Sequence, residues 1–131
     1  MTESTNPAGP AADSKVLICL NHGAEEPENV LIGYLVGVEA LRAGKQALMF
    51  LTKDAIHVAT PGFAEKIDVP GAPPVAALHE EYTALGGRFY ACPVCVKTRN
   101  MQDAAWVPNA EVAGVPSVFE YTQGGALVFN Y

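Results

Sequence analysis

The chain has 131 residues, of which 50% are hydrophobic and 17% are charged, and its formal net charge at pH 7 is −6. This length fits a single domain with one core, and the apolar content is too high for a disordered protein. Binding to the phosphates of nucleic acid requires clustered Lys and Arg side chains. The eight Lys and Arg residues of this chain are scattered, so we expect no nucleic-acid partner.

The apolar segments and the N-terminus indicate neither membrane insertion nor export. Residues 1–14 are polar, rich in Thr, Ser, Pro, Ala and Gly, and lack the apolar and basic regions of a signal peptide. We expect a disordered tail there, followed by one domain at residues 15–131. The longest strongly apolar stretch, near Val30–Val38, is far shorter than the roughly 18 residues needed to cross a bilayer, so no membrane partner is expected.

The cysteine content favours a reducing compartment. The chain contains three cysteines, whereas a secreted disulfide framework normally carries more of them and in even number. We therefore expect a cytoplasmic protein. In the cytoplasm, a close pair such as Cys92 and Cys95 serves redox chemistry, sulfur transfer or metal binding rather than structural cross-linking.

Apolar strands alternate with helices along the chain. Residues 15–20 form a nearly continuous apolar run, which is typical of a buried parallel strand. Pro27 follows two glutamates at the start of a helix that we expect to end at Ala43, before Gly44. The other predicted elements are a strand at 46–52, a short broken helix within 55–67, an amphipathic helix ending before Gly86, a strand at 88–91, a turn and helix from Cys92 to Met101, a weak strand near 111–113, a short helix near 116–122 and a strand at 126–129.

The helix expected at 27–43 is apolar around most of its circumference. Such a helix is buried on more than one side, and a domain of this size has few places to bury it so completely. One interpretation is that part of the helix faces another subunit; ordinary packing of the helix on the sheet is the alternative. Gly33 and Gly37, four residues apart, would let a sheet or a partner helix approach closely.

A second amphipathic helix follows the proline-rich loop. Its apolar face, formed by Val75, Leu78, Tyr82 and Leu85, is predicted to be buried. His79 lies off that face. We therefore expect His79 at the surface, and we expect the same of His57, which lies in the less regular segment before the loop.

The alternation of strands and helices predicts an α/β fold, with a parallel sheet, right-handed crossovers and helices on both faces. Sheets of this kind bind ligands at the carboxyl ends of their strands. Three of these ends carry polar or reactive side chains, at residues 21–23, 52–54 and 92–95. Their convergence at one edge of the sheet predicts a functional site.

The cysteine pair is the strongest candidate for chemistry at that edge. If Cys92 starts a helix, free backbone N–H groups and the helix dipole stabilise its thiolate, and Lys97 and Arg99 add positive potential. A thiolate attacks sulfur donors, disulfides and electrophiles. Cys95 can reach Cys92 within one turn and resolve a persulfide, a sulfenate or a mixed disulfide. The alternative is that both are small buried residues at a strand-to-helix turn.

The remaining candidates have structural alternatives of their own. His22 is expected at the same edge, where it can tune a thiolate, relay a proton or bind a metal, or can simply cap the loop. Asp54, Lys97 and Arg99 are either part of the site or solvated charges, and Cys19 is predicted to be a small core residue. Two cysteines fall short of a four-ligand zinc site, and no phosphate-binding glycine motif follows the first strand, so we predict neither a metal nor a cofactor.

Several segments together resemble the DsrE/DsrF-like family. Asn21-His22-Gly23-Ala24-Glu25-Glu26-Pro27 is similar to the family's turn after the first strand, and Ala43–Ala55 resembles its second strand and the turn that follows. The segment from Gly86 through Cys92 to Arg99 resembles the cysteine-bearing segment, and Val112–Pro116 resembles a turn before the last helix. The similar segments extend over nearly all of residues 15–131.

The resemblance implies a Rossmann-like three-layer α/β/α domain with a mostly parallel sheet of about five strands, assembled as a homotrimer or homohexamer. TusD-type relatives carry sulfur as a cysteine persulfide, and their cysteine lies at the strand-to-helix turn that Cys92 matches. The resemblance thus implies a sulfurtransferase-like role with sulfur-donor or sulfur-acceptor proteins as partners. It does not decide whether the protein is an enzyme.

Cys95 departs from the single-cysteine carriers of this family, because a dithiol can also release sulfur or cycle through a disulfide. Three hypotheses stay open. The first is a persulfide carrier in which Cys92 bears the sulfur and Cys95 resolves it. The second is a thiol–disulfide redox protein that uses the same pair. The third is a non-enzymatic oligomeric binding module in which the cysteines are incidental.

Overall fold

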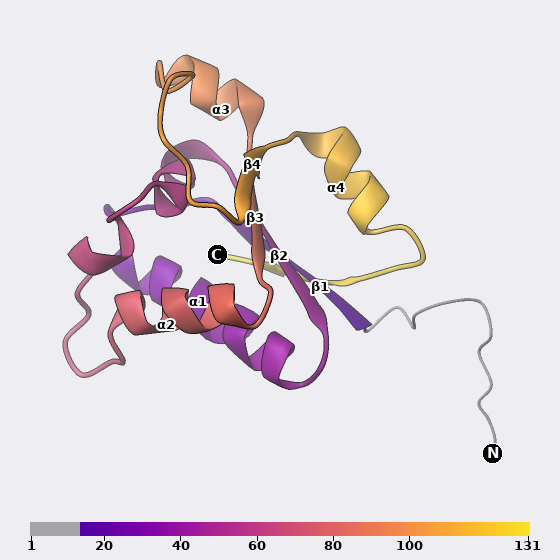
Figure 1. Cartoon of the computed structure of the whole chain (residues 1–131), viewed down its shortest axis with the longest axis horizontal. Coiled ribbons are helices and arrows are strands. Elements are labelled where there is room, and N and C mark those ends of the chain that lie inside the picture. Colours follow the sequence, from indigo (N-terminus) through magenta and orange to yellow (C-terminus); the bar gives the residue numbers. More distant parts are fainter. Residues whose placement is uncertain (1–13) are drawn as a thin grey trace.

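The computed structural model describes residues 14–131, which fold around one sheet of five parallel strands (Figure 1). The expected disordered tail, residues 1–14, lies outside the described residues except for Ser14. The order across the sheet is β4-β3-β2-β1-β5, and every neighbouring pair is parallel. The strands are β1 (Lys15–Leu20), β2 (Gln46–Leu51), β3 (Arg88–Ala91), β4 (Ala110–Val112) and β5 (Leu127–Asn130).

The helices cover the two faces of the sheet unequally, as Figure 1 shows. The chain steps in one direction from β1 to β4, so right-handed crossovers place α1 and α2 on the same face. The connection from β4 returns across the sheet to β5 and places α4 on the other face. The helical elements are α1 (Pro27–Arg42), η3 (Lys53–Ala59), η4 (Ala64–Lys66), α2 (Val75–Ala84), α3 (Pro93–Thr98) and α4 (Val115–Tyr121), of which η3 and η4 are 3₁₀ helices.

This architecture confirms the predicted three-layer α/β fold. The bounds of all five strands agree with the sequence-based expectation to within one residue. The cysteine-bearing helix is shorter than expected, because it ends at Thr98 rather than near Met101. No helix within residues 14–131 is long and apolar enough to cross a membrane.

Side chains alternate between the two faces of β1 and divide the core into two clusters. Val16, Ile18 and Leu20 point to the face covered by α1 and α2, where the larger cluster lies. Leu17 and Cys19 point to the opposite face and belong to a smaller cluster that α4 covers. Free energy from apolar burial is therefore concentrated on the α1/α2 face.

The expectation that His79 lies at the surface is wrong. His79 is half-buried, its Nδ1 lies 2.7 Å from the hydroxyl oxygen of Tyr34, and its ring stacks on Phe89 with 5.8 Å between centroids. Burial lowers the pKa of His79, although Glu65 and Glu80 act in the opposite direction. The neutral ring that burial favours can accept a hydrogen bond from the hydroxyl of Tyr34.

The buried face of α2 is also shorter than expected. Val75, Leu78 and Tyr82 are buried as predicted, but Leu85 is 44% exposed. The helix ends at Ala84, one residue before Leu85, so the backbone no longer holds that side chain over the core. Tyr82 instead anchors this end of the helix, because its hydroxyl donates to the carbonyl oxygen of Arg88 at 2.6 Å.

The apolar helix α1 buries most of its circumference but not all of it. Ile32 and Leu35 remain 39% and 37% exposed. Gly37 faces α2, and a Cβ atom at this position would lie 2.8 Å from the ring of Tyr82. A Cβ atom at Gly33 would lie 3.6 Å from Leu20, which is an ordinary contact distance. The close approach of α1 to Tyr82 of α2 therefore depends on Gly37, whereas Gly33 is not needed for close packing.

These two glycines form a matched pair for a stability measurement. We expect Gly37→Ala to lower the free energy of unfolding by about 1–2 kcal/mol, because the clash with the buried Tyr82 outweighs the gain in helix propensity. Gly33→Ala should raise the free energy of unfolding by up to about 1 kcal/mol, because it gains the propensity without a clash. Urea denaturation followed by circular dichroism measures both, and equal effects of the two variants would contradict the assigned packing.

Candidate functional site

The loops that follow β1, β2 and β3 meet at the carboxyl ends of these strands, a region that we call the carboxyl edge. Thr52 Oγ1 donates a hydrogen bond to Asn21 Oδ1 at 2.7 Å, which joins the first two loops. Gly23 packs so tightly on the second loop that a Cβ atom there would lie 2.5 Å from the carbonyl oxygen of Asp54. Only glycine permits this approach, which accounts for Gly23 in the first loop.

The cysteines are held between the loop after β2 and the first turn of α3. Cys92 directly follows β3, and its N–H donates to the carbonyl oxygen of Leu51 at 3.0 Å. Cys95 lies one turn later, and its Sγ accepts the backbone N–H of Lys53 at 3.0 Å. Lys53 has a left-handed backbone conformation, with φ of 54°, which is uncommon for residues other than glycine. A strained backbone residue thus presents its amide to a thiol.

The two cysteines lie three residues apart at the start of α3, and several neighbouring groups act on the Cys95 thiol. Burial raises the pKa of Cys95, the N–H of Lys53 lowers it, Cys92 raises it again through a hydrogen bond and its charge, and Arg99 lowers it slightly. The net effect is a raised pKa for Cys95.

An ion pair attaches α3 to the loop after β2. Arg99 Nε donates to Asp54 Oδ1 at 2.9 Å, and the two side chains are 30% and 51% exposed. Asp54 and Arg99, both predicted from the sequence, thus lie together beside the cysteines. Lys97 does not join them: it is exposed, and its side chain makes no ion pair or hydrogen bond within residues 14–131.

His22 lies at the carboxyl edge but bonds to an acid rather than to a cysteine. Its Nδ1 is 2.9 Å from Glu25 Oε2, and Glu25 Oε1 accepts the N–H of Gly23 at 2.7 Å. Burial acts to raise the pKa of Glu25, but the hydrogen bonds from His22 and the backbone outweigh burial and lower it. Sequence reasoning assigned Glu25 to the positive end of α1, and its spacing of three from His22 was the available signal.

A polar cavity of about 410 Å³ adjoins the carboxyl edge. Asp54 forms one wall, and the cavity continues between the loop after β1 and the two 3₁₀ helices. Sequence reasoning did not identify this cavity, because the segment that contains His57 and Lys66 has no regular periodicity. The cavity is lined mainly by Glu25, Asp54, His57, Thr60, Phe63 and Lys66.

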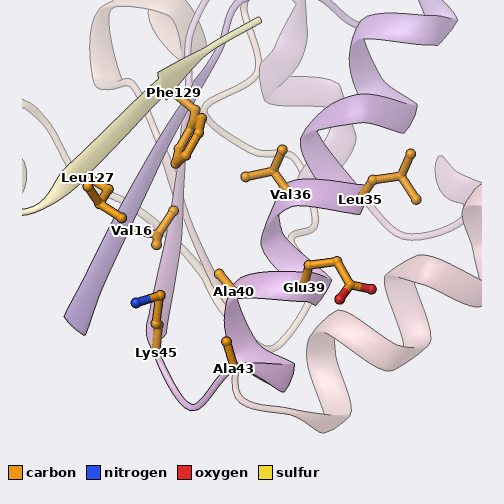
Figure 2. Close-up of a pocket in the computed structure, with 9 residues that line it drawn as sticks. All are labelled: Val16, Leu35, Val36, Glu39, Ala40, Ala43, Lys45, Leu127 and Phe129. Carbon is orange, nitrogen blue, oxygen red and sulfur yellow. The ribbon is translucent and has the colours of Figure 1, made fainter. Parts of the chain in front are cut away.

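A second, apolar groove of about 440 Å³ lies between α1 and the edge strand β5 (Figure 2). Its walls are Val16, Leu35, Val36, Leu127 and Phe129. Glu39 and Lys45 lie at its rim, as Figure 2 shows. This groove lies at the opposite end of β1 from Asn21, so it is separate from the cysteines.

The third cysteine, Cys19, is not placed for chemistry. Cys19 is half-buried in the smaller core cluster, and burial raises its pKa, which disfavours a reactive thiolate. Within the part of the chain that the structure describes, no group of three or more His, Cys, Asp or Glu side chains is arranged to hold a metal ion.

Comparison with known proteins adds a family and a set of similar folds. The sequence model of the DsrE/DsrF-like family matches residues 14–131. No match is found among curated proteins. Among solved structures, the ychN protein from E. coli aligns with a TM-score of 0.71 and 17% identity over 89% of this chain and 98% of that one.

Two further structures have the same fold. MTH1491, a protein of unknown function from Methanobacterium thermoautotrophicum, aligns with a TM-score of 0.62 and 15% identity, over 91% of this chain and 100% of its own. BT1422, a conserved protein of unknown function from Bacteroides thetaiotaomicron, aligns with a TM-score of 0.55 and 13% identity, over 90% of this chain and 95% of its own. At these identities the likeness supports the fold alone.

The charge of Arg99 gives a test of the arrangement around Cys95. In a Cys92→Ser background, we expect Arg99→Met to move the pH midpoint of Cys95 alkylation upward, because Arg99 lowers the pKa of this thiol. The matched control is Lys97→Met, which removes an equal charge from an exposed side chain and should leave the midpoint in place. Peptide mass mapping after timed alkylation measures Cys95 alone. Equal midpoints in the two variants would contradict the assigned geometry.

Proposed function

Because this chain belongs to the DsrE/DsrF-like family, which is generally related to sulfur relay, we propose that it handles sulfur through its cysteine pair. Cys92 carries the sulfur as a persulfide, and Cys95 resolves it. The observation that carries this assignment is the placement of the two thiols: Cys92 lies directly after β3 at the start of α3, and Cys95 lies one turn later with its Sγ bound to the N–H of Lys53. Burial raises the pKa of Cys95, which suits a thiol that acts in the later, resolving step.

Loading is a sulfur transfer to Cys92. The Cys92 thiolate attacks the terminal sulfur of a persulfide or polysulfide, a new S–S bond forms at Cys92 Sγ, and the S–S bond of the donor breaks. The donor departs as a thiolate with the bonding electron pair. Cys92 follows β3 directly and is half-buried, so its sulfur remains within reach of a donor.

Release uses the second cysteine. Cys95, once deprotonated, attacks Cys92 Sγ and displaces hydrosulfide, which leaves a disulfide between the two cysteines. Two electrons pass from the cysteine pair to the released sulfur, and a cellular thiol must reduce the disulfide before the next cycle. The N–H of Lys53 stabilises the Cys95 thiolate during the attack, because it already donates to this sulfur.

A thiol–disulfide redox protein is the second candidate, and the same contact between the thiols favours it. In that case the pair exchanges electrons with a protein or small disulfide without carrying sulfur. The three free cysteines fit a cytoplasmic location for either function. Protein donors or acceptors of sulfur are the partners that the first function requires.

Intact mass spectrometry distinguishes the two functions. After treatment with inorganic polysulfide, we expect a mass increment of one sulfur atom that reductant removes. Cys92→Ser should abolish the increment, whereas Cys95→Ser should retain and prolong it, because the resolving thiol is gone. Cys19→Ser is the matched control and should load normally, since Cys19 lies in a core cluster. A loss of two hydrogen atoms without any sulfur adduct would instead favour the redox protein.

We also infer that the protein assembles through the apolar groove and the neighbouring edge strand. Within residues 14–131, no strand pairs with the outer edge of β5. The strand contains no proline or charged residue, which are the devices that normally protect such edges. Leu127 and Val128 are 42% and 53% exposed. Glu39 and Lys45 carry opposite charges at the groove rim, so a two-fold arrangement can bring each against its counterpart on a second copy.

Such two-fold contacts join pairs of subunits in a homohexamer of D3 symmetry, whereas a homotrimer requires head-to-tail contacts. The sequence left open whether part of α1 faces another subunit. The position of Leu35 is compatible with that interpretation, because this residue lines the groove and is 37% exposed. Assembly through a second copy would cover apolar area that a monomer leaves in water.

Analytical ultracentrifugation tests the assembly. We expect the wild-type chain to sediment as an oligomer and Leu127→Lys to dissociate it, because lysine at an edge strand opposes pairing. The matched control is Phe119→Lys, which places the same charge at a 69% exposed apolar position on α4 and should leave the assembly intact. A monomeric wild-type protein, or dissociation by Phe119→Lys alone, would overturn the assigned surface.

A further inference from the structure

The polar cavity beside the carboxyl edge has a lining that neither the core nor the cysteines explain. Its volume of about 410 Å³ is in the range of small-molecule sites. Glu25 and Asp54 are both in its lining, close enough that the charge of Asp54 acts to raise the pKa of Glu25. Glu25 already binds His22 and Asp54 already binds Arg99, and a cation placed between the two carboxylates would relieve the repulsion that is left.

Lys66 brings a positive charge to the same lining. Lys66, on η4, and His57, on η3, also line the cavity, and neither side chain has an ion pair or hydrogen bond within residues 14–131. Phe63 is also part of the lining and is 8% exposed, so it contributes some apolar surface. The cavity therefore offers carboxylates to an ammonium group and a lysine to a carboxylate group.

From this lining, the geometry points to an α-amino acid, or the aminoacyl end of a small peptide, as the ligand of the cavity. The ammonium group lies between Glu25 and Asp54, and the carboxylate lies at Lys66. Asp54 belongs to both sites, because it lines the cavity and binds Arg99, and the preceding Lys53 donates its N–H to Cys95. A ligand side chain that passes Asp54 thus approaches the cysteines.

The position of the amino-acid group in the cavity also identifies the class of molecule that donates sulfur to Cys92. This step rests on the proposed function. The donor is a small persulfide that carries an α-amino acid group, such as cysteine persulfide. The Cys92 thiolate takes its terminal sulfur, a new S–S bond forms at Cys92, the donor's S–S bond breaks, and free cysteine leaves as a thiolate. The amino-acid group supplies the binding energy that positions the sulfur.

Binding is measured without sulfur transfer by using S-methylcysteine, which carries no reactive thiol. Titration of the ¹⁵N-labelled full chain should shift the amide resonances of Asp54, Thr60 and Lys66. The matched ligands 3-(methylthio)propionate and 2-(methylthio)ethylamine each lack one charged group and should bind about tenfold more weakly. Equal affinity for all three ligands, or no shift at these residues, would overturn the amino-acid site.

Variants of Lys66 test where the carboxylate of the ligand binds. Lys66→Met should weaken S-methylcysteine binding about tenfold, and Lys66→Arg should restore it, because only the charge is needed. The control on the same turn is Glu65→Gln, which lies outside the cavity lining and should bind as the wild type does. A Lys66→Met variant that binds normally would contradict the placement.

Loading experiments separate the donor class from the proposed function. Lys66→Met should raise the concentration of cysteine persulfide that half-loads Cys92, and should leave loading by inorganic polysulfide unchanged. Loading by both donors without any effect of Lys66→Met would overturn the donor class and leave the carrier function standing. Binding of S-methylcysteine without loading by either donor would overturn the carrier function and the donor class, and would leave an amino-acid site.

Discussion

The parallel, in-register pairing of β1, β2 and β3 is the constraint on which the candidate site depends. Leu20 pairs with Leu51, and Leu51 pairs with Ala91, so three strands end in the same row. The next residues of each chain segment must then share one edge, and this places Asn21, Thr52 and Cys92 side by side. A slip of one residue in any pair would exchange the side chains of the two faces of the sheet and separate the loops.

The order of the strands has a second consequence, which is the unequal cover of the sheet. Crossovers in one direction put α1, α2 and the 3₁₀ helices on a single face, where the ring of Tyr34 packs edge to face with the rings of Tyr82 and Phe89. Among residues 14–131, the seven-residue helix α4 is the helix that covers the other face. Val115 and Phe119 on this helix remain 49% and 69% exposed.

Local patterns in the sequence were sufficient for the strands, for α1 and for the position of the cysteine turn. Each of these depends on neighbours in the chain: an apolar run, a proline in a first turn, or a strand followed by Cys92 and Pro93. The burial of His79 could not be predicted in this way, because it depends on Tyr34, 45 positions earlier in the chain. The polar cavity could not be predicted from the sequence for the same reason, since its walls come from three short irregular segments.

The hydrogen bond to Cys95 could not be predicted from the sequence, because it depends on one backbone torsion angle, the φ angle of Lys53. Lys53 was expected at the carboxyl edge only as part of the polar segment 52–54, whereas its structural contribution comes from the N–H that its left-handed conformation directs at the sulfur. The support of this sulfur is therefore robust to mutation, because every residue except proline retains the N–H group. Glycine or asparagine would hold the same torsion angle with less strain. Substitution at position 53 can thus remove the lysine side chain while the N–H bound to the thiol persists. Related chains can therefore share the chemistry without sharing the residue.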